Sequence, residues 1–266
     1  MSIRCVYTDL DGTLLGRGGS LFADAEGGFT LLPARALEAC HRAGAEVVIK
    51  SGRRRAQVAE DARLIGQSSY IFELGAGMVI DGELTLLTGD WQPSEDRSVH
   101  DLIEASGAPT LLLERFAGRL ESFVPWALER EVTHLFRGTG VDAAEANELL
   151  ASAGHTDLRL VDNGALEEGG HGFHLLPAVS SKPAAVAAHM RARGFAPEEC
   201  IAVGDSREDM DAADVVGAFW LVANALERDP TLREAIGSRD NVRVAEASHG
   251  AGVYEAVVTT LAERRG

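Results

Sequence analysis

Residues 5–15 read CVYTDLDGTLL. An apolar, β-branched run at residues 5–8 is followed at once by Asp9, Asp11 and Gly12, which predicts a buried strand that ends in a turn with two carboxylates. This position matters because ligands of open α/β sheets bind in the crevice outside the carboxyl ends of the strands. We therefore expect the functional site to include Asp9 and Asp11.

The same alternation recurs at both ends of the chain. Expected strands at residues 3–8, 46–50, 70–74, 200–203 and 218–222 are interleaved with expected helices at residues 33–42, 53–64 and 183–193. Strands that alternate with helices predict a parallel, doubly wound sheet with helices on both faces. The fold class is therefore α/β, with a Rossmann-like core domain.

The middle of the chain has a different pattern. Expected helices at residues 95–105 and 143–153 alternate there with strand-like runs at residues 110–113, 132–136 and 158–161. We interpret this region as a smaller α/β domain inserted into the sheet domain. The predicted boundaries are 1–88 for the first part of the core, 89–178 for the inserted domain and 179–266 for the second part of the core.

Composition restricts the possible partners. The chain has 266 residues and a formal net charge of -16, which leaves no general basic face for nucleic acid. Its three cysteines, Cys5, Cys40 and Cys200, are odd in number and widely spaced, which favours a reducing compartment over a disulfide framework. No apolar run of about 18 residues occurs. We expect a cytoplasmic monomer or homodimer that binds neither nucleic acid nor membranes.

Other polar residues follow the expected strands. Ser51, Gly52 and Arg53 come directly after residues 46–50, and Asp205 comes after residues 200–204. Each has an ordinary structural interpretation, Ser51 as a helix N-cap and Asp205 with Glu208 as a capping box. Acids at the ends of neighbouring strands would nevertheless repel one another without a cation among them. Mg²⁺, which binds oxygen ligands and needs few carboxylates, suits such a small cluster.

Lys182 lies at the start of an expected helix. A lysine there faces the positive end of the helix dipole, which costs about 0.3–1 kcal/mol if the side chain is exposed. The chain has 25 basic residues, and only Lys50 and Lys182 are lysines. We therefore expect a negative group to compensate Lys182.

The stretch DLDGTLL at residues 9–15 resembles the first motif of the haloacid dehalogenase superfamily of phosphatases. Its three other motifs follow in order: Ser51 at a strand end, Lys182 at a helix start, and GDSRED at residues 204–209. The inserted domain resembles the large α/β cap of the Cof-type and mannosyl-3-phosphoglycerate phosphatase-like members. Two positions depart from the motifs, since Leu74 and Glu208 stand where the superfamily usually has asparagine.

The resemblance implies a magnesium-dependent phosphate-monoester hydrolase with an aspartyl-phosphate intermediate. Asp9 would be the nucleophile, and Asp11 would protonate the leaving group and then activate water. The implied metal ligands are Asp9, the backbone carbonyl of Asp11, Asp205, and Asp209 through water. The implied phosphate ligands are Ser51, Gly52 and Lys182. Thr13 either contacts the phosphate or caps the turn, and Arg53 either reaches the substrate or belongs to a solvated helix face.

The resemblance favours a small phosphorylated metabolite, either a sugar phosphate or a phosphoglycerate-type compound. The cap residues His134, Arg137, His171 and His174 could contact a polyhydroxylated or acidic leaving group, but a structural role is the simpler interpretation of each. Two alternative functions stay open: a phosphomutase of the same superfamily, and a receiver-like signalling protein with an aspartate phosphoacceptor. The receiver is disfavoured because Asp9 and Asp11 share one strand end and Lys182 is far along the chain.

Overall fold

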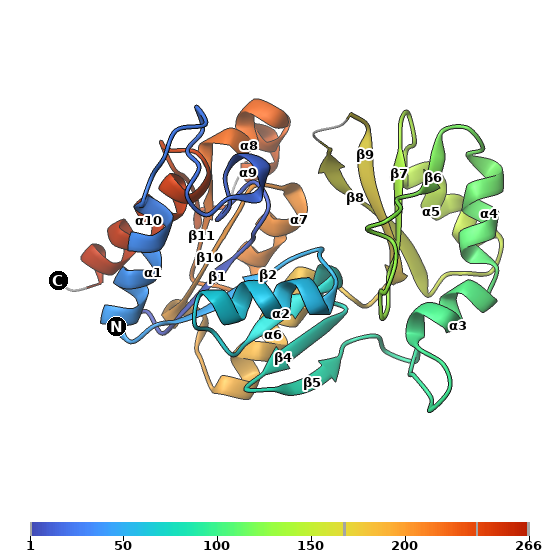
Figure 1. Cartoon of the computed structure of the whole chain (residues 1–266), viewed down its shortest axis with the longest axis horizontal. Coiled ribbons are helices and arrows are strands. Elements are labelled where there is room, and N and C mark those ends of the chain that lie inside the picture. Colours follow the sequence, from blue (N-terminus) through green and yellow to red (C-terminus); the bar gives the residue numbers. More distant parts are fainter. Residues whose placement is uncertain (1, 167–168, 238, 265–266) are drawn as a thin grey trace.

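The computed structural model describes residues 2–166, 169–237 and 239–264. Figure 1 shows two bodies, each built around its own sheet. The larger sheet has eight strands in the order β12-β11-β10-β1-β2-β3-β4-β5, and the smaller has four in the order β6-β7-β9-β8. The predicted α/β class, with a parallel core sheet and a separate smaller sheet, is confirmed.

The core sheet is parallel over six neighbouring strands. These are β12 (Val242–Val244), β11 (Ala218–Leu221), β10 (Cys200–Gly204), β1 (Cys5–Thr8), β2 (Glu46–Lys50) and β3 (Tyr70–Phe72). All four residues of β1 are buried, because Val6 packs into the cluster on one face and Cys5 and Tyr7 into the cluster on the other. Burial on both faces explains why this strand is an unbroken apolar run rather than an alternating one.

Helices cover both faces of the core sheet (Figure 1). One face packs against α1 (Leu32–Ala43), α2 (Arg55–Leu64) and α10 (His249–Glu263). The other packs against α6 (Lys182–Arg193), α7 (Arg207–Met210), α8 (Ala223–Arg228) and α9 (Leu232–Ile236). None of the described helices combines the length and hydrophobicity that a membrane span requires.

An antiparallel hairpin, which the sequence analysis did not predict, extends the sheet at one edge. Its strands β4 (Gly77–Ile80) and β5 (Glu83–Leu86) pair with each other, and β4 pairs antiparallel with β3. The Asp81-Gly82 dipeptide between them is a strong hairpin signal that would have identified it. β12 and α10 were also missed.

The inserted domain is an antiparallel sheet with helices on one face. Its strands are β6 (Leu120–Ser122), β7 (His134–Gly138), β9 (His171–Pro177) and β8 (Leu158–Ala165). Its helices are α3 (Val99–Ala105), α4 (Ala108–Arg115) and α5 (Ala143–Ser152). The strand expected at residues 110–113 is wrong, because α4 occupies it. Leu113 and Phe116, three residues apart, both pack in the hydrophobic core of the inserted domain, a spacing that puts them on one face of a helix but on opposite faces of a strand.

Glu73 ties the inserted domain to the core. It lies just after β3, is fully buried, and accepts backbone hydrogen bonds from Glu131 at 2.9 Å, Val132 at 3.1 Å and Thr133 at 2.6 Å. Three N–H donors satisfy a carboxylate that burial would otherwise destabilise. The start of β7 is therefore fixed relative to the carboxyl end of β3.

Gly75 makes a second close approach, against the start of α6. Its φ is +86°, and a β-carbon there would lie 2.1 Å from the carbonyl oxygen of Ser181. Only glycine permits both the backbone conformation and the contact. This approach fixes the position of the helix on which Lys182 is the first residue.

We predict that Gly75→Ala lowers the free energy of unfolding by more than about 3 kcal/mol, because it combines an unfavourable φ with a backbone collision. Gly66→Ala is the matched control, since Gly66 also has a positive φ, +73°, but nothing lies within 4 Å of its β-carbon position. We expect the control to cost about 1–2 kcal/mol. Urea unfolding of both variants measures the difference, and equal losses would contradict the proposed contact.

Candidate active site

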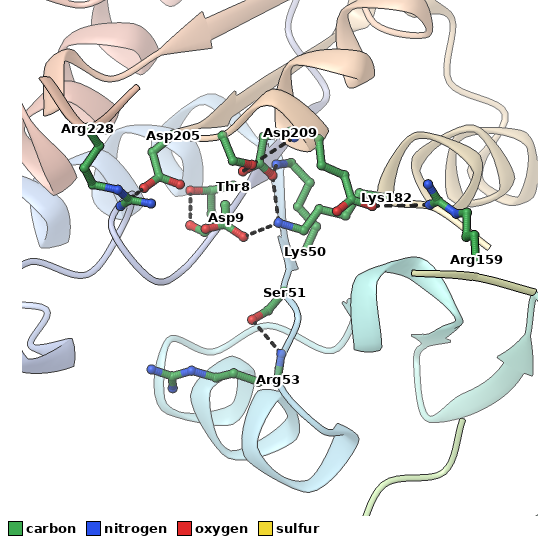
Figure 2. A network of polar contacts seen from close by, with 12 residues as sticks. Thr8, Asp9, Lys50, Ser51, Arg53, Arg159, Lys182, Asp205, Asp209 and Arg228 are labelled. Atoms are coloured by element: carbon green, nitrogen blue, oxygen red, sulfur yellow. Dashed lines mark hydrogen bonds and ion pairs between the residues drawn. The ribbon is translucent and has the colours of Figure 1, made fainter. Parts of the chain in front are cut away.

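The polar residues selected from the sequence meet at the carboxyl ends of adjacent strands (Figure 2). Asp9 follows β1, Ser51 follows β2 and Asp205 follows β10, and β1 pairs in parallel with both other strands. Asp209 comes from α7, which starts just beyond β10, and Lys182 opens α6. The sheet order therefore brings together segments that are far apart in the sequence.

Three buried carboxylates form the centre of the site. One oxygen from each of Asp9, Asp205 and Asp209 lies within 4.8 Å of the others. Gly12 allows this approach, because a β-carbon at Gly12 would lie 2.2 Å from Oδ2 of Asp205. Asp11 differs from the cluster: its side chain is exposed and binds Arg53 at 2.6 and 2.8 Å. Metal binding through the backbone carbonyl of Asp11 stays a prediction.

Three cations balance the three carboxylates. Nζ of Lys182 donates to Oδ1 of Asp9 at 2.8 Å and to Oδ1 of Asp209 at 2.9 Å, and Lys50 donates to the same Asp209 oxygen. On the other side, Nη1 of Arg228 binds Oδ2 of Asp205 at 2.6 Å. Lys182 thus has the negative partners that its place at a helix start requires.

Lys50 and Arg228 are site residues that were not predicted from the sequence. The rarity of lysine in this chain and the place of Lys50 directly before Ser51 were the available signals for Lys50. Arg228 ends a helix distant in sequence from every motif, so no local pattern marks it. Both residues are recognisable only once the fold brings them to the carboxylates.

The surrounding charges shift the pKa values of Asp9 and Asp209 in opposite directions. Burial and the charge of Asp209 raise the pKa of Asp9 to about 7, although Lys182 and Lys50 oppose the shift. Burial acts on Asp209 in the same direction, but Lys182 and Lys50 outweigh it and hold the pKa of Asp209 below its usual range. Asp209 is therefore ionised at neutral pH, while Asp9 exchanges a proton in that range.

The donor set fits a divalent metal ion. It consists of oxygen ligands from three buried carboxylates, the kind of site that Mg²⁺ prefers. With three cations already present, a divalent ion would give the cluster two excess positive charges. A phosphate dianion would then restore neutrality. Arg228 competes for Asp205, but its side chain is 42% exposed, so it has room to move away.

The predicted phosphate ligands Ser51 and Thr13 lie in the segments that follow β2 and β1. Ser51 is buried, and its Oγ accepts a hydrogen bond from the N–H of Arg53 at 3.1 Å. α2 begins only at Arg55, so the interpretation of Ser51 as the helix N-cap is wrong. Thr13 is fully buried, and its Oγ1 has no hydrogen-bond partner among the described residues. Neither residue belongs to the group of three carboxylates.

Arg53 and the Asp205-Glu208 pair differ from their simplest interpretations. The guanidinium of Arg53 binds Asp61 at 2.9 Å as well as Asp11, so in this structure it orients Asp11. Its contact with substrate stays a prediction. The capping box of Asp205 with Glu208 is wrong, since Ser206 caps α7 and accepts from the N–H of Asp209.

Glu208, one of the two departures from the motif, connects the site to the cap. Its side chain is 12% exposed, and partial burial raises its pKa although Lys182 and Arg159 oppose the shift. Nη2 of Arg159, on β8, lies 3.5 Å from Oε1 of Glu208 and donates to the carbonyl of Ser180 at 2.8 Å. The charge that replaces a neutral asparagine therefore has a cation supplied by the cap.

Solved structures share this architecture over its whole length. The sucrose-phosphatase of a Synechocystis species superposes with a TM-score of 0.71 and covers 98% of each chain at 17% identity. A haloacid dehalogenase-like hydrolase from Bacteroides thetaiotaomicron gives a TM-score of 0.65, covers 97% of this chain and 99% of its own, and is 15% identical. At these identities the likeness concerns the fold. No protein-family model matches the chain.

Proteins with more similar sequences identify the family. The phosphoglycolate phosphatase of Halorubrum lacusprofundi is 30% identical over 234 residues, which cover 85% of this chain and 86% of the relative. The chain belongs to the haloacid dehalogenase superfamily of phosphatases. A phosphoglycolate phosphatase of Methanothermobacter thermautotrophicus is 26% identical over 256 residues, 96% of this chain and 97% of the relative. The resemblance found in the motifs is confirmed, and the protein is a phosphatase.

We predict that Lys50→Met destabilises this phosphatase by about 3 kcal/mol, because it leaves excess negative charge in a buried cluster. Mg²⁺ should restore more stability to the variant than to the parent, since the ion replaces the lost charge. Urea unfolding with and without Mg²⁺ measures both effects. Arg42→Met, which removes an exposed pair with Glu38, is the control and should change stability by less than about 1 kcal/mol. A stable Lys50→Met protein without a magnesium effect would contradict the charge balance.

Proposed function

We propose that this phosphatase requires Mg²⁺ and transfers the phosphoryl group of its substrate to Asp9. The observation that supports the proposal best is the environment of the Asp9 carboxylate. It is buried at the end of β1, one of its oxygens accepts from Lys182, and its neighbours Asp205 and Asp209 complete an oxygen ligand set. A phosphate drawn to these cations would meet the carboxylate as a nucleophile.

The surrounding residues fit the remaining roles. Lys182, Ser51 and the backbone N–H of Gly52 would hold the non-bridging phosphate oxygens before and during the transfer. Asp11, held by Arg53 outside the carboxylate cluster, would protonate the leaving oxygen and then take a proton from the water that hydrolyses the aspartyl-phosphate. Asp9, Asp205 and Asp209 would hold Mg²⁺, which when bound neutralises charge on the phosphate and the nucleophile.

For the substrate we propose a small phosphorylated hydroxy acid, with phosphoglycolate as the first candidate. Four sequence relatives, 25% to 30% identical to this chain, bear the name phosphoglycolate phosphatase. Phosphoglycerate-type compounds share the carboxylate, and sugar phosphates lack it, so both belong in the comparison. Release of inorganic phosphate from a single substrate separates this hydrolase from a phosphomutase.

We predict that Asp9→Asn reduces phosphate release by at least about 10³-fold, because an amide cannot serve as the nucleophile. Assays of phosphate release from phosphoglycolate with Mg²⁺ measure the loss, and a chelator should abolish turnover by the parent. Asp157→Asn, at an exposed position of the cap, is the control and should retain full activity. Equal turnover by parent and Asp9→Asn would remove Asp9 from its role.

The intermediate can be located directly. With a substrate whose leaving group needs no protonation, such as 4-nitrophenyl phosphate, Asp11→Asn should accumulate the phosphoenzyme, because activation of the hydrolytic water is impaired. Acid quenching followed by peptide mass mapping should find the phosphate on Asp9. A phosphate ester mapped to any other residue, or no phosphoenzyme in either protein, would contradict the mechanism.

The pKa of Asp9 predicts how metal binding depends on pH. Mg²⁺ requires the ionised carboxylate, so the metal displaces the proton that Asp9 holds below its pKa of about 7. Affinity should therefore rise between about pH 6 and about pH 8 and level off above that range. Calorimetry in buffers of different ionisation enthalpy measures the released proton. Asp9→Asn should show no such proton release, and a pH-independent affinity in the parent would contradict the assignment.

A further inference from the structure

One face of the cap sheet lies over the predicted phosphate site. On β9, Phe173 and Leu175 are buried in the cap core with the helices, so His174 between them points to the opposite face. On β8, Leu158 and Leu160 are buried in the same core of the cap. Arg159 between them points away from that core and contacts Ser180 and Glu208. The face that carries His174 and Arg159 is therefore the one turned toward the core domain.

Two polar side chains of the cap converge on Gly52. A β-carbon at Gly52 would lie 3.1 Å from Nδ2 of Asn163 and 3.4 Å from Nε2 of His174. Gly52 follows Ser51 directly, so both nitrogens lie beside the place predicted for the phosphate. Arg130 of the cap also contacts Gly52, because its Nη1 donates to the carbonyl of Gly52 at 3.1 Å.

The surroundings of His174 make it a neutral hydrogen-bond donor. Burial lowers the pKa of His174 well below its usual value, and the charges of Arg130 and Lys182 act in the same direction. Its Nδ1 lies 3.3 Å from Oγ1 of Thr133, which accepts from Arg130 at 2.9 Å. When the Thr133 hydroxyl uses its hydrogen for Nδ1, the ring proton is on Nε2. No described residue accepts a hydrogen bond from Nε2.

We propose that Nε2–H of His174 and the Nδ2 amide of Asn163 bind the carboxylate of the leaving group and thereby select phosphorylated hydroxy acids. The inference rests on the proposed function and deepens it. Two N–H donors next to the phosphate site match the two oxygens of a carboxylate that is separated from the ester oxygen by a short carbon chain. The buried guanidinium of Arg130 adds a favourable charge behind them.

The same pair would disfavour other leaving groups. An apolar group would leave both donors without a partner in a buried place, which costs affinity. His174 therefore has a binding role in this proposal, in place of the structural role expected from the sequence.

The test measures binding in the Asp9→Asn background, so that it does not depend on turnover. Two ligands are compared by calorimetry with Mg²⁺: 2-phosphoglycolate, and 2-hydroxyethyl phosphate, in which an alcohol replaces the carboxylate. We expect Asn163→Asp and His174→Leu each to weaken phosphoglycolate binding by about 10- to 100-fold. The affinity for 2-hydroxyethyl phosphate should change much less. His174→Gln, which keeps an N–H donor, should recover part of the loss.

His171→Leu alters an exposed histidine of the same strand, paired with Asp162, and should leave both affinities unchanged. Equal affinity of the Asp9→Asn protein for both ligands would overturn the proposal, as would equal weakening of both ligands in the variants. Failure of the proposed function has a different signature: the parent would then release no phosphate, whatever the binding data show.

Discussion

Three carboxylates buried at one edge of a sheet are the constraint that the rest of this structure satisfies. Asp9 and Asp205 are brought together by the parallel pairing of β1 with β10, and Asp209 follows within one short helix. Without cations their repulsion and desolvation would destabilise the fold. Lys50, Lys182 and Arg228 supply those cations. The stability of the core edge and its capacity to bind an anion therefore have the same origin.

The cap is placed by a second set of buried polar contacts. Glu73 accepts hydrogen bonds from three backbone N–H groups at residues 131–133, just before β7, and Gly75 lets the chain pass against Ser181 at the start of α6. Both residues lie in the short segment after β3. One local backbone conformation thus sets the position of the cap and the position of Lys182 together. A substitution that changed the backbone conformation of that segment would displace the phosphate site and the leaving-group site together.

The sequence predicted what depends on local pattern. The motif at residues 9–15, the strand ends and Lys182 were identified because an apolar run followed by a polar turn is visible without knowledge of the fold. Lys50, Arg228 and Asn163 were missed, since each is defined by contacts with residues distant in sequence. The error at α4 has another cause: a short apolar run such as residues 110–113 suits a buried helix as well as a strand.

The departure at Glu208 shows how the two domains depend on each other. The partly buried carboxylate of Glu208 adds negative charge that a neutral asparagine would not. The core offers it mainly Lys182, which already binds Asp9 and Asp209. Arg159 of β8 provides the missing charge. The same strand carries Asn163, which lies over Gly52. Because one cap strand both neutralises the metal loop and approaches the phosphate site, a shift of that strand would change the electrostatics of the core and the selection of the leaving group together.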